Sequence, residues 1–208
     1  MVQSKNLREG TATRAAGRRT ARKIVEAAEE LLMTGDSTQF SMRHVAARAG
    51  VHLANLQYYF PTRDHLLHAL FDHVGTRYAQ AIAERLAASG DAPMEQFLAA
   101  VDFHLEDIRD IRTRRFFIQL WALLGSLDAY SGRLLRELYQ IDIDQLSDLI
   151  KLIDTSAPHE AIERRATLLA AMIEGLMLMI GPDDSDADTL TKIMVDARQQ
   201  AMRIARGD

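Results

Sequence analysis

The segment of residues 41–71, SMRHVAARAGVHLANLQYYFPTRDHLLHALF, constrains the fold more than any other part of this chain. Its first part predicts a short helix whose apolar side chains share one face, at Val45, Ala46 and Ala49. Gly50 follows where a residue in the left-handed conformation would end that helix. A second helix is expected from about Leu53 to Tyr59, before Pro61 stops it. This second helix is too short to be stable without the first.

Two short helices joined at a glycine occur in many helical proteins, and only a minority of these bind DNA. The charges around the segment favour DNA. Through residue 23 the chain has seven Lys and Arg against the single Glu9, and Arg43, Arg48 and Arg63 lie within the segment itself. Basic side chains before and through such a motif are typical of proteins that contact phosphates.

The net charge of −4 argues by itself against a nucleic-acid-binding protein, but the charge is unevenly distributed. Residues 1–73 have ten Lys and Arg against seven Asp and Glu, which gives +3; residues 74–208 have fifteen against twenty-two, which gives −7. This asymmetry indicates one end that faces DNA and a body that does not.

The helix RKIVEAAEELL, the turn AARAGV and the aromatic stretch QYYFPTRDHLL together resemble the DNA-binding domain of the TetR family of transcriptional repressors. The specific similarity covers roughly residues 18–71; beyond it, only size, helicity and helix order agree. The resemblance implies an N-terminal three-helix domain that reads operator DNA. It also implies a helical C-terminal domain that binds a small molecule and forms a homodimer.

We therefore expect an all-α protein with a flexible basic arm (1–17), a helix-turn-helix domain (18–71) and a helical regulatory and dimerisation domain (72–208). The arm is either a disordered tail or a segment that enters the minor groove. The first apolar periodicity predicts a helix from about Thr20 to near Gly35. A longer helix, from about Arg63 to Ala88, would connect the two domains. No strand alternation appears along the sequence.

The resemblance assigns DNA contacts to both helices of the motif. Asn and Gln can pair with adenine, Arg reads guanine, and small apolar groups can meet a thymine methyl. Tyr59 and Arg63 match phosphate-contacting positions, although Tyr59 could equally be a core aromatic residue. His52 departs from the family pattern, because it replaces a capping serine and is a weaker cap. The predicted DNA-binding residues are Ser41, Arg43, Leu53, Ala54, Asn55, Gln57, Tyr59 and Arg63.

The last two predicted helices, from Pro158 to about Ile180 and from about Ala187 to Ala205, suggest how the chain assembles. The first has apolar residues around its axis and needs two surfaces to cover it. The second has one apolar face, formed by Leu190, Ile193, Met194, Ala197, Ala201 and Ile204. We expect a homodimer through about residues 158–205, as a palindromic operator requires, although a larger monomer core could also bury these residues.

The family arrangement also implies a central cavity for a small-molecule effector. Each of the residues assigned to it could instead simply fill the core, but as a set they favour an apolar or aromatic ligand. Arg112, Arg114 and Arg115 leave room for an acidic group if they point inward. The predicted pocket residues are Phe103, His104, Phe116, Phe117, Trp121, Tyr139 and Met172.

Other classes of protein are disfavoured. The chain has no cysteine, which fits a reducing cytoplasm, and its longest apolar run, at residues 166–181, contains Glu174 and is too short to span a bilayer. His65 and His68 share a helical face, but without further ligands they do not predict a metal site. No phosphate-binding glycine loop or nucleophile motif occurs, so no cofactor is expected and an enzyme is disfavoured. The alternative function is a helical small-molecule-binding protein or enzyme that does not use its helix-turn-helix on DNA.

Overall fold

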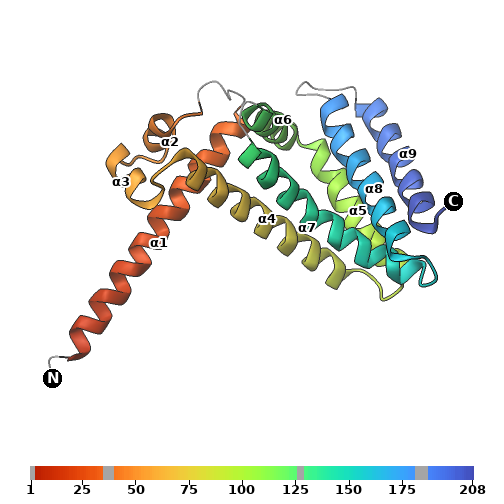
Figure 1. The fold of residues 1–208 in the computed structure, drawn as a ribbon, viewed down its shortest axis with the longest axis horizontal. Coiled ribbons are helices and arrows are strands. Elements are labelled where there is room, and N and C mark those ends of the chain that lie inside the picture. The colour runs from red at the N-terminus through yellow and green to blue at the C-terminus, as the bar shows by residue number, and fades with distance from the viewer. Residues whose placement is uncertain (1–2, 35–39, 126–128, 181–186) are drawn as a thin grey trace. The chain divides into compact units, whose positions relative to one another are not determined.

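The computed structural model describes residues 3–34, 40–125, 129–180 and 187–208, and within these ranges every regular element is a helix. The predicted all-α fold is confirmed. The chain divides into two compact units, residues 1–73 and 74–208 (Figure 1).

The N-terminal unit contains α1 (Gln3–Met33), α2 (Met42–Arg48), α3 (Leu53–Tyr59) and the first turns of α4 (Arg63–Ala88). Helix α4 continues without a break into the second unit. Inside the first unit, α1 packs against α2 and α3 (Figure 1). The core that joins them is formed by Ile24, Ala28, Leu32, Val45, Leu56, Leu66, Leu67 and Leu70.

Helix α1 begins at Gln3, whereas the apolar periodicity predicted a start near Thr20, after an arm that is either disordered or enters the minor groove. The extra turns contain Ala, Arg, Leu and Glu, which favour helix, and no proline that would interrupt it. These residues have helix propensity without an apolar face. Because periodicity detects only the apolar face, it could not place this part of the helix.

Two short sequence signals fix the ends of the motif helices. Gly50 has a φ of +62°, in the left-handed region that side chains with a Cβ rarely adopt, and it makes the turn between α2 and α3. Thr62 precedes α4, and its hydroxyl accepts a hydrogen bond from the backbone N–H of His65 at 3.3 Å. The glycine turn agrees with the expected one, and the Thr62 hydroxyl caps the N-terminus of α4.

The C-terminal unit is a helical bundle. It contains the rest of α4 together with α5 (Pro93–Arg109), α6 (Ile111–Gly125), α7 (Ala129–Ile153), α8 (His159–Ile180) and α9 (Ala187–Arg206). Helices α5, α7, α8 and α9 lie side by side (Figure 1). The break between α5 and α6 falls at Asp110, within a stretch rich in charged residues.

Helix α9 uses its apolar face inside its own unit. Leu190, Met194 and Ala201 are all buried in the isolated chain. The sequence had assigned this face to the dimer interface, and the larger core of the bundle accounts for it instead. Helix α8 differs, because Leu168, Leu178 and Met179 keep between 56% and 83% of their side chains exposed.

None of the helices in the described ranges is long and apolar enough to cross a membrane.

Candidate nucleic-acid interface and effector cleft

Helix α3 is anchored on one side and free on the other. Leu56 is completely buried and holds the helix against the rest of the unit. Ala54, Asn55 and Gln57 are exposed, and Leu53 is half-buried at the start of the helix. His52 stands at the N-cap position and its side chain makes no capping hydrogen bond, as its chemistry led us to expect.

Helix α2 holds two of the basic residues in different environments. The hydroxyl of Ser41 accepts a hydrogen bond from the backbone N–H of His44 at 3.3 Å, so this side chain caps α2. Arg43, in the first turn, is exposed. Arg48, in the last turn, forms an ion pair with Glu30 of α1 at 3.2 Å. Arg43 is therefore placed on the surface, whereas Arg48 also ties α2 to α1.

The two tyrosines at the end of α3 differ in exposure. Tyr59 is half-buried, and its hydroxyl lies beside Gly17 of α1. Tyr58 is 80% exposed and meets the Tyr59 ring edge to face, with centroids 5.2 Å apart. Our sequence analysis assigned no role to Tyr58. Its spacing of four residues from Ala54 and three from Asn55 places it on the same helical face, and this spacing was the signal available.

Arg63 begins α4 beside the end of α3. Its guanidinium lies 5.8 Å from the centroid of the Phe40 ring, and its buried Nε has no hydrogen-bond partner. A guanidinium that stacks on an aromatic ring keeps its charge and its remaining donors. The side chain is thus held in place by Phe40, and within the described residues its guanidinium forms no ion pair with a carboxylate.

The C-terminal unit contains a narrow cleft, partly open to solvent, whose free interior of about 20 Å³ is close to the space that one water molecule needs. Helices α4, α5, α6, α7 and α8 all contribute to its lining. Of the predicted pocket residues, His104, Phe117 and Tyr139 line this cleft. The cleft is also lined by Val74, Gly75, Tyr78, Ile141, Asp142, Glu174 and Met177.

The other predicted pocket residues lie outside the lining. Phe103 and Phe116 pack edge to face against lining rings, those of Tyr78 and Phe117 respectively. The indole N–H of Trp121 donates a hydrogen bond to the Tyr139 hydroxyl. These three residues therefore contact lining residues without lining the cleft themselves.

Met172 is also absent from the lining, because it lies on a different face of α8 from Glu174 and Met177. The arginines at positions 112, 114 and 115 do not make the cleft basic either, because none of them belongs to its lining. Arg114 is only 2% exposed, but its guanidinium donates to the backbone carbonyls of Ile108 and Arg109 at 2.7 and 3.0 Å. These hydrogen bonds satisfy carbonyl groups at the C-terminal end of α5.

The two carboxyl groups in the cleft were missed by our sequence analysis of the pocket. Burial raises the pKa of Asp142 to about 6. Burial, followed by the nearby charge of Asp142, raises the pKa of Glu174 to about 8. Burial also lowers the pKa of His104 to about 4, so the imidazole is neutral at neutral pH. Only the convergence of α5, α7 and α8 brings these groups together, and no local spacing indicates it.

A hydrogen bond joins α4 to α5 at the edge of the cleft. The Tyr78 hydroxyl donates to Asp107, which also accepts from Thr113 at 3.1 Å. Burial and the adjacent Asp107 charge raise the pKa of Tyr78, so this phenol keeps its proton. The second half of α4 is thereby fixed to the cleft wall.

The histidines at the start of α4 have local partners. Thr62 contacts the His65 ring at 2.7 Å, and His68 lies 3.4 Å from Asp72. No group of three or more potential ligands that could hold a metal ion occurs within the described part of the chain.

Comparison with known proteins supports the assignment of the first unit. Residues 24–70 match the family "Bacterial regulatory proteins, tetR family". An uncharacterized HTH-type transcriptional regulator from Xanthobacter autotrophicus is 26% identical over 88% of this chain and 90% of its own. The HTH-type transcriptional regulator BetI of Stenotrophomonas maltophilia is 28% identical over 64% of this chain and 67% of its own.

A solved structure extends the similarity to the fold of the whole chain. The TetR transcription regulator from Haloarcula marismortui superposes with a TM-score of 0.70, covering 91% of this chain and 98% of that one at 20% identity. At this identity the superposition supports the fold alone.

Helix α3 is short, is anchored on one side and has an exposed polar face. A glycine turn joins it to α2, which has a basic residue in its first turn. This arrangement defines a DNA-binding transcriptional regulator of the helix-turn-helix class. Its relatives are regulators and not enzymes. The family match of residues 24–70, the related regulators and the shared fold together support a TetR family transcriptional regulator.

Proposed function

We propose that the chain represses transcription as a homodimer that binds a palindromic operator and releases it when a small molecule occupies the cleft. The observation that carries the DNA-binding part is the free face of α3, where Asn55 and Gln57 are exposed although Leu56 between them is completely buried. Side chains with both donors and acceptors on such a face suit the major groove.

In this proposal Asn55, Gln57 and Ala54 read bases, while Arg43, Tyr59 and Arg63 contact phosphates. Leu53 would meet a thymine methyl from the first turn of α3. Ser41 would act mainly as the cap of α2, since its hydroxyl already accepts a backbone hydrogen bond. We add Tyr58 to the contacting residues because its exposed ring shares the free face of α3.

The experiment that tests DNA binding compares the DNA upstream of the protein's own gene with a random duplex of equal length in fluorescence anisotropy. At about 150 mM salt non-specific binding is weak, so a specific regulator should still bind the upstream fragment. Equal affinity for both duplexes would contradict the proposal. A footprint with two-fold symmetry would add support for a dimer.

Helix α4 supports the effector part of the proposal. Its first residue, Arg63, belongs to the proposed DNA contacts, and its second half contributes Val74, Gly75 and Tyr78 to the cleft lining. An effector that prefers one placement of this helix could therefore change operator affinity. A ligand that binds both placements equally well could not.

Trp121 provides a spectroscopic test of where the effector binds. Its N–H bonds to Tyr139, a lining residue, so a ligand in the cleft should alter its fluorescence. It is also the only tryptophan in the chain. If a compound releases DNA but leaves the emission unchanged, and Trp121→Phe does not alter its potency, the effector binds elsewhere.

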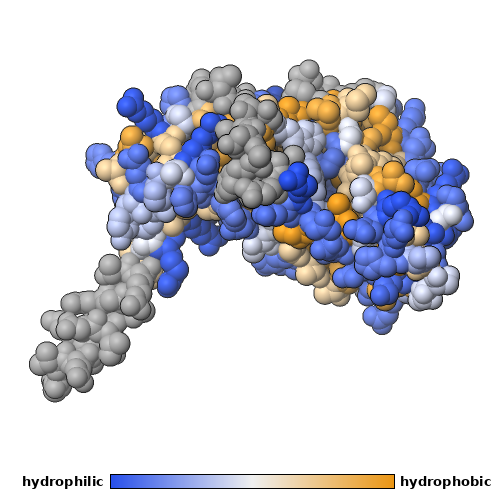
Figure 2. Space-filling model, in the orientation of Figure 1, coloured by the Kyte–Doolittle hydropathy of each residue, from blue (hydrophilic) through white to orange (hydrophobic). Residues whose placement is uncertain are grey.

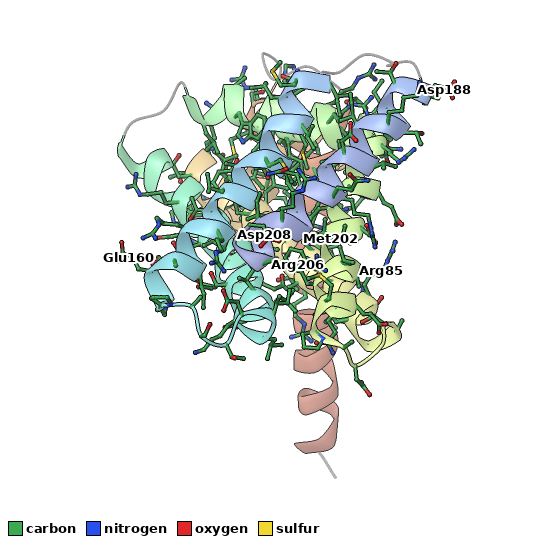
Figure 3. The ribbon with its side chains drawn as sticks, turned by 90° about the vertical axis from the view of Figure 1, so that its right-hand side faces the viewer. Arg85, Glu160, Asp188, Met202, Arg206 and Asp208 are labelled. Atoms are coloured by element: carbon green, nitrogen blue, oxygen red, sulfur yellow. The ribbon has the colours of Figure 1, made fainter. Side chains whose placement is uncertain are left out.

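The dimer would form through the exposed apolar face of α8, beside which α9 runs in the opposite direction (Figure 3). Leu168, Met172, Gly175 and Met179 follow the spacing of one helical face along α8. Leu168 and Met179 are exposed, and a Cβ added at Gly175 would meet no atom within 4 Å. Such a stripe suits close helix packing with a second copy.

A further inference from the structure

The cleft in the C-terminal unit is acidic inside, and this sets the charge of what it can hold. Asp142 and Glu174 line it together with the aromatic rings of Tyr78, Phe117 and Tyr139. No lysine or arginine belongs to its lining among the residues that the structure describes. A site for a carboxylate or phosphate would need the opposite arrangement.

The carboxyl groups have few partners within the protein. Glu174 is 3.4 Å from the Tyr139 hydroxyl, at the limit of a hydrogen bond. The Asp142 side chain forms no hydrogen bond or ion pair with another residue of the described chain. Carboxyl groups removed from water without a counterion are costly unless they are protonated or find a cation.

His104 provides a second, independent indication of a ligand. It is 5% exposed and lines the cleft, where its ring centroid lies 6.3 Å from that of Tyr78 and 5.4 Å from that of Phe103. Neither ring nitrogen forms a hydrogen bond with another described residue, and neither is fully closed off from the open space of the cleft. A nearly buried polar ring without a partner is unusual, and a ligand in the cleft could provide one.

The aromatic wall gives such a ligand an apolar and electron-rich surface. The Tyr78 hydroxyl is already bonded to Asp107, and one face of its ring already meets a cation, because the Arg77 guanidinium lies 5.7 Å from the ring centroid. Phe117 meets the Tyr78 ring edge to face at 6.0 Å. Aromatic faces attract cations and also cover apolar groups.

From this arrangement we infer that the cleft binds a small organic cation, a protonated amine with an apolar group, with Glu174 and Asp142 as its counterions and His104 as a neutral hydrogen-bond partner. The inference rests on the proposed regulatory role of the cleft and names the chemical class of its effector. It adds a positive charge to the apolar or aromatic ligand that the sequence favoured, in place of the acidic group for which the arginines at 112, 114 and 115 left room. A metal ion fits less well, since no group of three or more potential ligands occurs within the described chain.

Binding of a cation in this cleft should also release a proton from Glu174. The pKa of Glu174 is about 8 in the empty cleft, so this group is mostly protonated at neutral pH. A nearby cation favours the ionised form and lowers that pKa. Binding therefore releases a proton, and affinity should rise with pH until the pH exceeds the pKa of the empty cleft.

The other ionisable groups around Glu174 leave this direction unchanged. From α7 it faces Asp142, whose charge raises its pKa, and Tyr139, whose hydroxyl lowers it by hydrogen bonding. From α5 it faces His104, which is neutral. From α4 it faces Tyr78, which keeps its proton, and the nearby Arg77 acts on Tyr78 and Asp107.

Calorimetric titration of the full chain with benzylamine, benzyl alcohol and benzoate tests the inference, because these probes share a ring and differ in charge. We expect benzylamine to bind on the order of tenfold more tightly than benzyl alcohol, and benzoate to bind least tightly. Titrations in two buffers with different ionisation enthalpies should show proton release at neutral pH.

Variants separate a role of the carboxyl groups in ligand binding from a merely structural one. Glu174→Gln should abolish the proton release, and both it and Asp142→Asn should reduce the preference for amine over alcohol on the order of tenfold. The matched controls are Glu163→Gln on α8 and Asp144→Asn on α7, which change exposed carboxylates on the same helices. The controls should leave the preference and the proton release unchanged.

Three results would overturn the inference: equal affinity for benzylamine and benzyl alcohol, no binding of benzylamine, or a preference that survives in both variants. Circular dichroism establishes that the variants are folded. The titrations contain no DNA, so they are independent of operator binding. If the chain binds its operator but not the amine, only this inference fails; if it binds the amine but no operator, the proposed repressor function fails.

Discussion

Helices α3 and α8 both have a face that their own unit does not cover, but the two faces differ in chemistry. The free face of α3 contains Asn55 and Gln57, whereas that of α8 contains Leu168 and Met179, which are 61% and 83% exposed. Orange patches also interrupt the hydrophilic surface of the C-terminal unit in Figure 2. A polar face without a structural role suits a nucleic acid, and an exposed apolar face suits another protein surface.

The interiors of the two units differ as well. Glu29 of the N-terminal unit is buried and pairs with His73 at 3.4 Å. In the C-terminal unit, Asp142 and Glu174 share a cleft whose lining contains no lysine or arginine among the described residues. The carboxylate of the first unit thus has an ion-pair partner from the same unit, whereas the carboxyl groups of the cleft are left for a ligand. The raised pKa values of Asp142 and Glu174 give the second unit a pH response.

The largest effect is expected where the apolar face of α8 is given a charge. Leu168→Glu combined with Met179→Glu would place two carboxylates in the proposed interface and should weaken dimerisation on the order of a hundredfold or more. Ala122→Glu, at an exposed position on α6, is the control. Light scattering at micromolar concentration measures the outcome, and an unchanged dimer would show that this face is not the interface.

A smaller effect is expected on the polar face of α3. Asn55→Ala and Gln57→Ala should each cost about 1–3 kcal/mol of operator binding and relax the base preference at one position. Arg63→Ala should instead weaken binding to all sequences and reduce the salt slope by about 1. Anisotropy titrations against single-base operator variants distinguish the two classes. A base-specific effect of Arg63→Ala, or an unchanged salt slope, would contradict its assignment to a phosphate.

These two faces were not equally visible in the sequence. The α3 face follows from local spacing, because Gly50, Leu56 and Pro61 fix the turn, the buried side and the end of one short helix. The apolar excess of α8 was also visible. However, only the packed bundle shows that the apolar face of α9 is internal and that Met172 lies on a different face from the cleft residue Glu174.

The acidic cleft could not be predicted, because Tyr78, His104, Asp142 and Glu174 come from four different helices. Each residue in isolation is an ordinary member of an amphipathic helix. The sequence did identify part of the wall, since His104, Phe117 and Tyr139 line the cleft. It missed the carboxyl groups because an aromatic inventory contains no information on which charges face the same space.

The pH dependence of stability should distinguish the interiors of the two units. Burial raises the pKa of Glu174 from 4.5 to about 8, so the folded state binds a proton that the unfolded state loses. The free energy of unfolding should therefore fall as pH rises through this range, by up to about 1.4 kcal/mol per pH unit from this group.

The interval from pH 6.5 to 8 isolates this effect. His104 contributes below it, because its pKa falls from 6.5 to about 4 and stability is lost as pH falls through that range. Asp142 also titrates below it, at about pH 6. Urea denaturation should show that the free energy of unfolding declines between pH 6.5 and 8. Glu174→Gln should flatten this decline, and Asp144→Asn should leave it unchanged. A decline of the same slope in Glu174→Gln would assign it to another group.

The smallest effects are expected from ion pairs that join helices within each unit. Arg48 and Glu30 are about 40% exposed, whereas the side chains of Arg165 and Asp154 are each 21% exposed and 2.8 Å apart. Water and salt screen the first pair more strongly, so Arg48→Ala should cost about 0–1 kcal/mol of stability, and Arg165→Ala more than that. Hydrogen bonds from Arg165 and then Ser156 are the main causes that lower the pKa of Asp154. The stability that the pair of Arg165 and Asp154 contributes should therefore be lost as pH falls toward that pKa. Urea denaturation of both variants at low and high salt measures these costs. If Arg48→Ala costs more than Arg165→Ala at high salt, exposure does not explain the difference between the pairs, and Arg48 must stabilise α2 through contacts other than its charge.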